Sequence, residues 1–432
     1  MKALEKNICV LATTYAVNPY KGSEDGMGWN FILQIASHQE VIAITRENNR
    51  EAIEAYQLDH PDARYARIRF EYFDLPYWMR FWKKGGRGAL LYYYLWQLFL
   101  PLFIWQRSLA FDVCHNVNFH NDWTPTFLWV LGEPLVWGPV GHHPAIPTNC
   151  LRKYGWKQWL SYRLRDVVKW TLGHFDPLLW LARWKADHVF CMNSKAWYWG
   201  SDKSLMPSVS SEPKSLKMEQ KQKGFKILSV GRFTPLKGFD LTIASFAAFL
   251  KALPLEDREN VSLQLIGQGT SEEFLRNEIQ RLGIEENVEV ISWVDRQQLD
   301  LYYQQASVFL FPSHEGAGMV VSEALAFGLP IVTLDSSGAG EFIDARCGLT
   351  IAYGGYSQMV GHLSQALKTL FSNPVLKEDM EKSAKERHQT LFDWDRKADK
   401  LKGVYQKVLA GKSGDSLPEM KKNFITTSSR GL

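Results

Sequence analysis

The chain has 432 residues, more than one ordinary hydrophobic core organises, so two or three domains are expected. Hydrophobic residues make up 46% and charged residues 22%, as in soluble globular proteins, and the net charge of +4 comes without a block of five or six like charges, so no nucleic-acid partner is expected. Five scattered cysteines without a Cys-x-x-Cys pair favour a reducing compartment, here the cytoplasm, over a disulfide framework or a zinc site.

The first 200 residues alternate strand-like and helix-like segments, which predicts an N-terminal Rossmann-like domain over 1–200. The start, MKALEKNICVLATTYAV, predicts a buried first strand and not a secretory signal, because its apolar run is too short and it has no small-residue cleavage site. In GWNFILQIAS, Trp29, Ile32, Leu33 and Ala36 follow the i, i+3, i+4, i+7 spacing of an amphipathic helix. Further strands are expected at EVIAIT, RIRFEYF, DVCHNV, PLVWGPV and HVFCMNS.

Aromatic and basic residues gather in this first domain, which holds 15 of the 17 tryptophans. The stretch 77–107 contains a 17-residue apolar run that is too short for a membrane span and is interrupted by Gln97 and Pro101, so a buried or interfacial helix is expected. The stretch 151–170 mixes six basic residues with three tryptophans and one acid. Two interpretations of 151–170 are open: an amphipathic helix on anionic lipid, or a solvated helix with buried rings.

Four histidines follow predicted strands of the first domain. His115 and His120 stand at the end of DVCHNV and in the loop after it, where a histidine could orient or contact a hydroxyl group of a ligand. Such a residue is more often structural, and of the two we favour His120 because it lies further into the loop. His142 and His143, after PLVWGPV, are expected to line the same edge of the sheet.

A polar segment with two prolines, 201–224, predicts a linker. The alternation of strands with helices of 10 to 15 residues then continues over 225–390 and predicts a second Rossmann-like domain with a parallel sheet. The fold class is therefore α/β, with two doubly wound domains facing each other and ligand sites at the carboxyl ends of their strands. A last helix at 391–410 could pack back on the first domain, and 411–432 is expected to be a flexible tail.

The candidate site of the second domain combines two carboxylates with two cations. In FPSHEGAGMVVSEALAFGLPIV, a helix is expected to open on Gly316, Ala317 and Gly318, between Glu315 and Glu323. Eight residues of helix rise about 12 Å, so the carboxylates suit the hydroxyl groups at the two ends of an elongated ligand. Free backbone N–H groups from Gly316 to Val320 favour a phosphate between them. This layout fits a sugar, a diphosphate and a ribose.

Arg232 and Lys237 lie in VGRFTPLKGFD, the loop after the first strand of the same domain. That loop opens at the same carboxyl edge, so both side chains could neutralise a diphosphate as a sugar leaves. Without the glutamates, an ordinary basic turn would be the better explanation of these two residues, and the glutamates at the same edge reverse that preference.

Together, VGRFTPLKGFD, LIGQG, PSHEGAGMVVSEALAFGLPIV and SSGAGEFI resemble the nucleotide-sugar half of glycosyltransferase family 4, with its GT-B fold and Glu-x7-Glu motif. The resemblance is close over about 225–351. It implies a retaining transfer from a nucleoside diphosphate sugar, with no cofactor and no metal. It also implies that the reacting groups are held by Glu315, Lys237, Arg232 and His120, and the donor by Glu323, Gly316, Ala317, Gly318, Met319, Val320, Gly231, Gly267, Trp293, Val294 and Gly26.

The individual roles that the resemblance implies are as follows. Glu315 would hold the hydroxyls of the transferred sugar and Glu323 the ribose, while main chain near Trp293 and Val294 would meet the base. Gly26 belongs to GSEDGMGW, which stands where the family places a glycine-rich loop close to the donor phosphate and the acceptor.

The predicted reaction moves a hexose to a glycan or a lipid-linked acceptor, in cell-surface polysaccharide or glycolipid synthesis. An anionic membrane surface could bind 77–107 and 151–170. Alternatives are a nucleotide-sugar epimerase, a phosphorylase or a non-catalytic sugar-binding relative. DWD, Asp393–Asp395, resembles a metal-binding Asp-x-Asp pattern, but its position at a helix start favours an N-cap.

Overall fold

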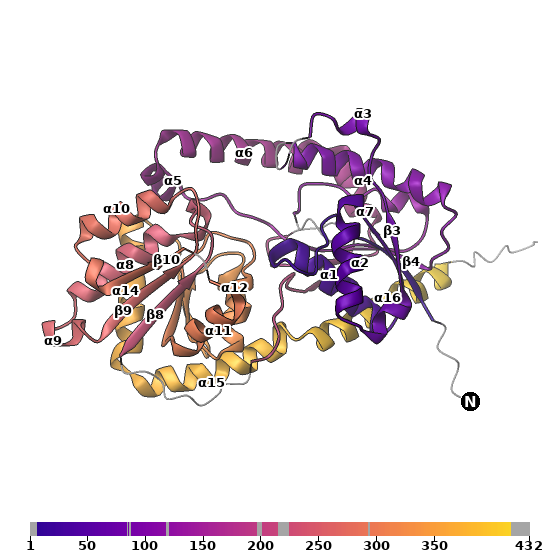
Figure 1. Cartoon of the computed structure of the whole chain (residues 1–432). Coiled ribbons are helices and arrows are strands. Elements are labelled where there is room, and N and C mark those ends of the chain that lie inside the picture. Colours follow the sequence, from indigo (N-terminus) through magenta and orange to yellow (C-terminus); the bar gives the residue numbers. More distant parts are fainter. Residues whose placement is uncertain are drawn as a thin grey trace, which may run out of the picture.

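The chain folds into two lobes, each built on a parallel β-sheet with helices on both faces (Figure 1). The computed structural model describes residues 7–83, 85, 88–117, 121–196, 201–214, 224–292 and 294–415. We call the lobe around the seven-stranded sheet the first lobe and the lobe around the six-stranded sheet the second lobe.

The first lobe contains seven parallel strands in the order β3-β2-β1-β4-β5-β6-β7. Its strands are β1 (Cys9–Thr13), β2 (Glu40–Thr45), β3 (Ile68–Tyr72), β4 (Val113–Asn116), β5 (Leu135–Val140), β6 (His188–Cys191) and β7 (Asp202–Leu205). Its helices are α1 (Ser23–Ala36), α2 (Arg50–Asp59), α3 (Tyr77–Arg80), α4 (Ala89–Gln106), α5 (Thr148–Leu151), α6 (Trp156–Phe175) and α7 (Pro177–Lys185).

The second lobe contains six parallel strands in the order β10-β9-β8-β11-β12-β13. Its strands are β8 (Phe225–Val230), β9 (Val261–Ile266), β10 (Val288–Ile291), β11 (Val308–Phe311), β12 (Ile331–Leu334) and β13 (Gly348–Ile351). The helices from here to the end of the described chain are α8 (Phe239–Lys251), α9 (Leu255–Arg258), α10 (Glu272–Leu282), α11 (Arg296–Gln305), α12 (Met319–Ala326), α13 (Ala339–Phe342), α14 (Tyr356–Ser372), α15 (Pro374–Leu391) and α16 (Trp394–Asp415).

Successive residues of the central strands pack into different hydrophobic cores. In β1, Val10 lies in one core cluster and Leu11 in another, and in β8 the same is true of Ile227 and Leu228. Since neighbouring side chains of a strand point to opposite faces, each sheet is covered on both sides. This confirms the predicted class of two α/β domains. The strand order reverses between β1 and β4 in the first sheet and between β8 and β11 in the second. At such a point the loops at the carboxyl edge diverge, and open parallel sheets bind their ligands there.

The segment between the sheets differs from the expected linker at 201–224. Its first residues form β7, which pairs in parallel with β6 at the edge of the first sheet. Three of the four residues of β7 are exposed, so its sequence lacks the apolar run by which buried strands are recognised. The rest of the segment is described only to residue 214 and again from 224.

Part of the predicted first domain packs on the second lobe. Ile146, Cys150 and Leu151 are buried in the core that also holds Phe233 and Phe239. The hydroxyl of Tyr154 donates a hydrogen bond of 2.7 Å to the buried Asp240 of α8. From there α6 runs back over the first lobe, so this helix spans both lobes (Figure 1).

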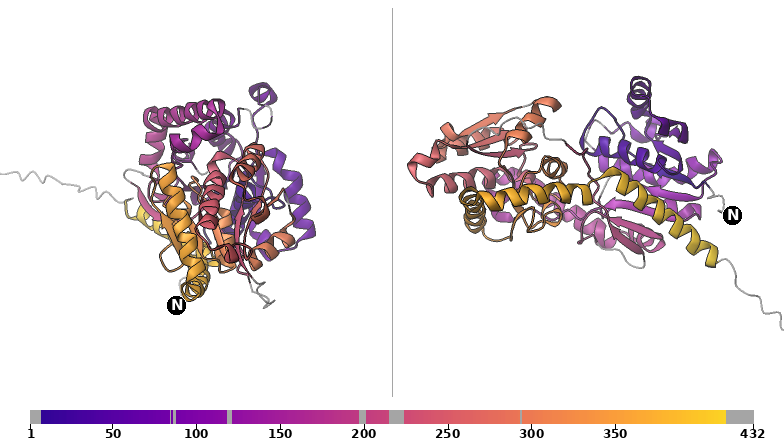
Figure 2. Two further views of the ribbon diagram at one scale, coloured as in Figure 1. Left: turned by 90° about the vertical axis from the view of Figure 1, so that its left-hand side faces the viewer. Right: turned by 90° about the horizontal axis from the view of Figure 1, so that it is seen from below.

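The last helix also crosses between the lobes. Figure 2 shows α15 on the second lobe and α16 continuing along the first lobe. Trp394, at the start of α16, makes an edge-on ring contact with Phe31 of α1, with centroids 5.6 Å apart. The expected tail 411–432 lies outside the described residues from 416 on, and residues 411–415 continue α16.

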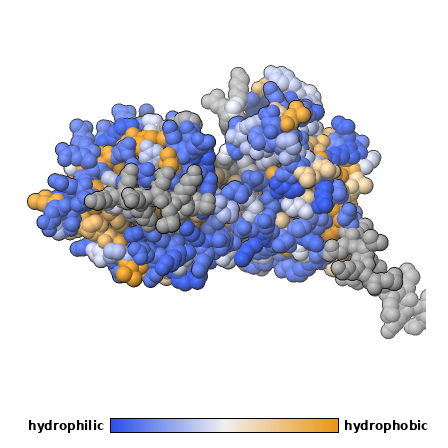
Figure 3. All heavy atoms as spheres, turned by 60° about the horizontal axis from the view of Figure 1, so that its bottom comes forward, coloured by the Kyte–Doolittle hydropathy of each residue, from blue (hydrophilic) through white to orange (hydrophobic). Residues whose placement is uncertain are grey.

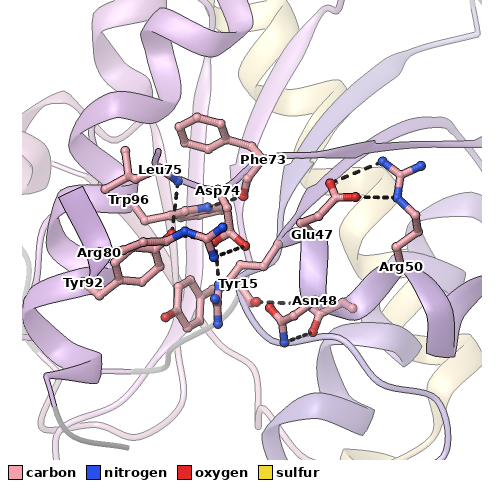
Figure 4. A network of polar contacts seen from close by, with 12 residues as sticks. Tyr15, Glu47, Asn48, Arg50, Phe73, Asp74, Leu75, Arg80, Tyr92 and Trp96 are labelled. Carbon is pink, nitrogen blue, oxygen red and sulfur yellow. Dashed lines mark hydrogen bonds and ion pairs between the residues drawn. The ribbon is translucent and has the colours of Figure 1, made fainter. Parts of the chain in front are cut away.

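A buried polar network fixes α4 at the carboxyl edge of the first sheet (Figure 4). The carboxylate of Asp74 accepts hydrogen bonds from Arg46 at 2.9 Å and from the hydroxyl of Tyr92 in α4 at 2.5 Å. The indole N–H of Trp96 donates to the carbonyl of Phe73 at 2.9 Å. These buried hydrogen bonds orient α4, one face of which is buried. No described helix is both long and apolar enough to cross a membrane.

Candidate active site at the carboxyl ends of β8 and β11

Lys237 and Glu315, two of the predicted site residues, form an ion pair. β8 and β11 are neighbours in the second sheet, and the loops that follow them carry Lys237 and Glu315 respectively. The ammonium of Lys237 donates a hydrogen bond to Oε2 of Glu315 at 2.7 Å, and the two side chains are 13% and 14% exposed. The ammonium also lies 5.5 Å from the ring centroid of Phe311. The sequence thus located a cation and a carboxylate that meet at one edge of the sheet.

The loop after β8 is held close to its neighbours by glycines. Gly238 has a φ of +69°, and a Cβ at this position would lie 2.0 Å from the carbonyl oxygen of Pro312. Gly267 has a φ of +153°, and its Cβ would lie 1.9 Å from the carbonyl oxygen of Gly231. These glycines let the ends of β8, β9 and β11 approach each other, which brings Lys237 to Glu315.

The predicted start of the helix between the two glutamates is wrong by three residues. α12 begins at Met319, so Gly316, Ala317 and Gly318 form the loop that precedes it. Gly318 has an extended φ of 179°, which is incompatible with a helical turn. The first N–H groups of α12 lack partners within the helix, as at every helix start, so the expected anion site remains at this end.

Glu323 is buried in α12 with partners for both carboxylate oxygens. Oε1 accepts a hydrogen bond of 2.5 Å from Arg296 at the start of α11, and Oε2 accepts one of 3.0 Å from the hydroxyl of Tyr303. The Glu323 side chain is 5% exposed and that of Arg296 is 52% exposed. Sequence reasoning missed Arg296 and Tyr303, because a separation of 27 and 20 residues gives no local signal of contact.

The two lobes touch at the glycine-rich loop before α12. A Cβ at Gly316 would lie 2.5 Å from the carbonyl oxygen of His142 and 2.8 Å from Nδ1 of His143. Asn193, after β6, donates from its amide to the carbonyl oxygens of His142 at 2.9 Å and of Gly316 at 3.4 Å. The loops after β5 and β6 of the first sheet therefore lie directly against the predicted phosphate-binding loop of the second.

A second contact between the lobes lies beside the first. The backbone N–H of Ser194 donates to Glu341 of α13 at 2.7 Å, and its hydroxyl donates to the other carboxylate oxygen at 2.9 Å. Neither Asn193 nor Ser194 was predicted as a site residue, although both lie at the carboxyl end of the expected strand HVFCMNS, and that position was the available signal.

The histidines have different environments. His115 is fully buried in β4, where Nε2 donates to the carbonyl oxygen of Gly138 at 2.8 Å and Nδ1 accepts from the hydroxyl of Tyr405 in α16 at 2.6 Å. Burial lowers the pKa of His115 to about 4, so this histidine is neutral and structural. The ring of His142 lies 2.8 Å from a carboxylate oxygen of Asp122. His120, favoured from the sequence, lies outside the described residues.

The other predicted residues lie around this edge with less defined contacts. Arg232 is exposed directly after β8, Met319 and Val320 are half-buried in the first turn of α12, and Trp293 lies outside the described residues. Val294 packs partly buried against the core. Gly26 is buried in the first turn of α1, where a Cβ would lie 2.3 Å from the carbonyl oxygen of Lys21, so close packing alone explains the glycine.

Buried polar atoms without a hydrogen-bond partner among the described residues mark the same edge. They are Nε2 of His314, after β11, and the hydroxyls of Ser336 and Ser337, after β12. Burial lowers the pKa of His314 to about 4, so its ring is neutral. Buried polar atoms normally have partners, so we expect water or a polar ligand here.

A cavity of about 870 Å³ lies in the first lobe next to this site. Its walls come from the loops after β4, β5 and β6 and from one face each of α6 and α7. It is lined by Asp122, Trp123, His142, His143, Ala145, Asp166, Lys169, Trp170, Gly173, His174, Trp180, Arg183, Trp184 and Lys195. His142 and His143 belong both to this lining and to the contact with Gly316, so the cavity adjoins the predicted donor site.

Asp393 has the structural role expected of it. Its carboxylate accepts a hydrogen bond of 2.9 Å from the backbone N–H of Arg396, as an N-cap of α16 does. Within the described part of the chain, no three His, Cys, Asp or Glu side chains are grouped to hold a metal ion.

A protein-family model matches a part of the chain that lies mainly in the second lobe. Residues 211–387 match the family model of glycosyl transferases group 1. This segment, less than half of the chain, is therefore similar to group 1 glycosyltransferases. The match confirms the enzyme class expected from the sequence, at the level of a glycosyltransferase.

Curated proteins similar to this chain align with about half of it or with about two thirds of it. An uncharacterized glycosyltransferase of Haemophilus influenzae is 30% identical over 209 residues, which are 48% of this chain and 52% of that protein. Its match thus spans about half the length of the relative. A glycogen synthase of Mycobacterium tuberculosis is 26% identical over 319 residues, covering 69% of this chain and 72% of that protein.

The fold of both lobes together is also found in solved structures. Sucrose-phosphate synthase from Thermosynechococcus elongatus superposes with a TM-score of 0.64 at 16% identity, covering 94% of this chain and all of that one. The predicted GT-B fold, with two Rossmann-like domains, is confirmed.

Proposed function

We propose that the protein is a retaining glycosyltransferase of family 4 that moves a hexose from a nucleoside diphosphate sugar to a glycan or lipid-linked acceptor, in the synthesis of a cell-surface polysaccharide or glycolipid. The observation that carries this proposal is the ion pair of Lys237 and Glu315 beside the glycine-rich loop before α12. It joins a cation for a diphosphate with a carboxylate for sugar hydroxyls at the edge where open α/β sheets bind ligands.

The donor diphosphate would bind at the N–H groups of Gly316 to Val320, with Arg232 and Lys237 beside it. As the bond between the sugar and the phosphate breaks, negative charge grows on the departing diphosphate, and the two cations stabilise that charge. Glu315 orients the ammonium of Lys237 and accepts hydrogen bonds from the sugar. Gly231 and Gly267 allow the close approach of the strand ends behind this group.

The ribose would lie at the buried end of the site, near Glu323. Arg296 and Tyr303 fix this carboxylate in one orientation, which pre-organises it for the ribose hydroxyls. The base would meet main chain near Trp293 and Val294. Gly26 and His120 belong to the first-lobe side of the proposed site.

Transfer would proceed with retention and without a metal ion. The acceptor hydroxyl attacks the sugar from the face that the diphosphate leaves, a new carbon–oxygen bond forms, and the leaving phosphate oxygen takes the acceptor proton. The protein then supplies positioning and charge stabilisation more than acid–base chemistry. Proton NMR of the product tests this step, because an inverted anomeric configuration contradicts it.

Association with an anionic membrane is the second part of the proposal. α6 exposes a stripe of apolar side chains, and α3 and α6 lie along the same side of the molecule (Figure 1). The opposite side, which comes forward in Figure 3, is predominantly hydrophilic. The exposed apolar residues of α6 are Trp156, Leu160, Leu164, Val167, Val168, Trp170 and Phe175, and those in and next to α3 are Tyr77, Trp78 and Phe81.

Lys157 and Arg165 are exposed on α6 and could attract anionic lipid. Sedimentation with anionic vesicles at low salt tests this surface. Leu164→Asp should weaken vesicle binding, whereas Leu255→Asp, on α9 of the second lobe, should leave it unchanged. If the protein does not sediment with such vesicles, peripheral membrane binding is contradicted. The proposed donor site does not depend on this result.

Thermal stability with UDP, GDP, ADP and their sugars tests the donor site. A ligand at a hundred times its dissociation constant adds about 2.7 kcal/mol to the free energy of unfolding. We expect a clear shift with one base, which Glu323→Gln reduces and the exposed control Glu286→Gln does not. If no nucleotide shifts the unfolding temperature, the proposed donor site is wrong.

A further inference from the structure

The cavity of the first lobe combines an aromatic wall with a charged floor. On α6 the lining residues are spaced i, i+3, i+4, i+7, i+8 from Asp166, so they form one face of the helix. On α7 they are Trp180, Arg183 and Trp184, again one face. The floor comes from loops at the carboxyl ends of the neighbouring strands β4, β5 and β6.

The aromatic wall is only partly covered by protein. Trp170, Trp180 and Trp184 remain 57%, 60% and 64% exposed, although all three line the cavity. Phe175 at the end of α6 and Leu178 in the first turn of α7 are also exposed. Indole rings that are left this open offer apolar contact area to a ligand chain at the mouth of the cavity.

The acidic and basic side chains that line the cavity differ in whether they have ion-pair partners. Both acids are already engaged: Asp122 with His142 at 2.8 Å, and Asp166 with Arg163 at 3.1 Å. In the described part of the chain, neither Lys169 nor Lys195 has an ion-pair partner. Burial and, secondly, Arg165 lower the pKa of Lys169, and the carboxylates of Asp166 and Asp122 offset this lowering only in part.

We infer that this cavity binds an amphiphilic acceptor that carries an anionic phosphate group on an apolar chain. Lys169 and Lys195 bind the phosphate, and the tryptophans of α6 and α7 bind the part of the chain next to it. A volume of about 870 Å³ lies within the range of ligand sites, and is large enough for a phosphate, a sugar and a short part of the chain.

The position of the cavity connects the inference to transfer. His142 and His143 line the cavity and contact Gly316, so a sugar attached to the bound phosphate would reach the loop that precedes α12. That the ligand is an acceptor rests on the proposed function, whereas its chemical class rests on the lining alone.

The test measures binding by isothermal titration calorimetry without nucleotide, using dodecyl phosphate below its micelle concentration. Dodecyl maltoside and inorganic phosphate are the comparison ligands. We expect dodecyl phosphate to bind at least tenfold more tightly than either. Equal affinity for the maltoside would show an apolar surface only, equal affinity for inorganic phosphate would show a free anion site only, and each result overturns the inference.

Matched variants locate the binding. Lys169→Ala should weaken binding of dodecyl phosphate about tenfold, and Lys157→Ala, on α6 outside the cavity, should not. Trp184→Ala should weaken it as well, and the equally exposed Trp156→Ala should not. Should Lys169→Ala misfold, the exposed Lys195→Ala gives the same comparison. Equal losses in a cavity variant and its control would contradict a site in the cavity.

The result of this binding test can be told apart from the result of the thermal-stability test of the donor site. A nucleotide-induced shift of the unfolding temperature without binding of dodecyl phosphate overturns this inference and leaves the donor site. Binding of dodecyl phosphate without any nucleotide shift overturns the donor site instead.

Discussion

Lys237 and Glu315 lie 78 positions apart in the chain and meet over 2.7 Å. Each side chain is mostly withdrawn from solvent, so each charge depends on the other for compensation. The pair joins the loop after β8 to the loop after β11, and it holds the ammonium beside the start of α12. Removing one partner of such a pair leaves an uncompensated charge, which is more costly than losing an exposed ion pair.

Lys237→Ala should lower kcat/KM about a hundredfold, equivalent to about 2.7 kcal/mol of barrier, because the departing diphosphate loses a cation. It should also lower the unfolding temperature, because the Glu315 carboxylate loses its partner. Steady-state kinetics and thermal unfolding measure the two effects, with Lys251→Ala at the end of α8 as the control. A loss of activity under threefold would remove Lys237 from the reaction.

Arg296→Ala should weaken donor binding about tenfold, or 1.4 kcal/mol, and leave the rate at saturating donor nearly unchanged. The reason is that Arg296 would act through Glu323, whose Oε1 it holds, and not at the bond that breaks. A rise in KM for the donor with a constant kcat is the expected pattern. Arg281→Ala, which removes an exposed ion pair with Glu278, is the control. An equal fall in kcat would contradict a positioning role.

Gly316→Ala should separate the loops of the two lobes. Its Cβ would lie within 2.8 Å of both His142 and His143, so one side of the contact has to move. We expect kcat/KM to fall by at least tenfold. The control is Gly361→Ala, in the interior of α14, where a Cβ meets nothing within 4 Å and should stabilise the helix by roughly 0.5–1 kcal/mol. Unchanged kinetics in Gly316→Ala would show that the contact is dispensable.

The fold could be predicted where its signals are local. Strands buried on both faces, such as β5 with all six residues buried, appear in the sequence as continuous apolar runs. β7 could not be found this way, because an exposed edge strand has no such run. The packing of Ile146, Cys150 and Leu151 on the second lobe was equally invisible, since apolar residues do not reveal which core they enter.

The residues of the candidate site were likewise predicted where the sequence carries a signal and missed where it carries none. Lys237 and Glu315 were found because both were expected in loops at the carboxyl edge of one parallel sheet, whereas the pairing of β8 with β11 that brings these loops together comes from the structure. Arg296 and Asn193 were missed because their roles arise from side-chain contacts across the fold. His115 shows the converse, since its place at a strand end suggested a site, while its partner Tyr405 lies 290 positions further along the chain.

His115 should make the stability of the protein depend on pH between about 6.5 and about 4. Its pKa in the folded protein is about 4, below the ordinary value of 6.5, because burial disfavours the charged ring. As the pH falls below 6.5, the unfolded chain takes up a proton at His115 and the folded chain does not, so the free energy of unfolding decreases. The decrease ends near pH 4 and amounts to about 3 kcal/mol, from 1.36 kcal/mol per pKa unit.

The measurement is urea-induced unfolding at pH 4, 5, 6 and 7 for the natural chain and for His115→Gln. Burial also lowers the pKa of His188, His314 and His388, so the natural chain loses stability for several reasons in this range. The difference between the two proteins isolates His115, because the other groups are common to both. His115→Gln should be the less stable protein at pH 7, and the gap should narrow as the pH falls to 4. A gap that stays constant over this range would show that folding does not lower the pKa of His115.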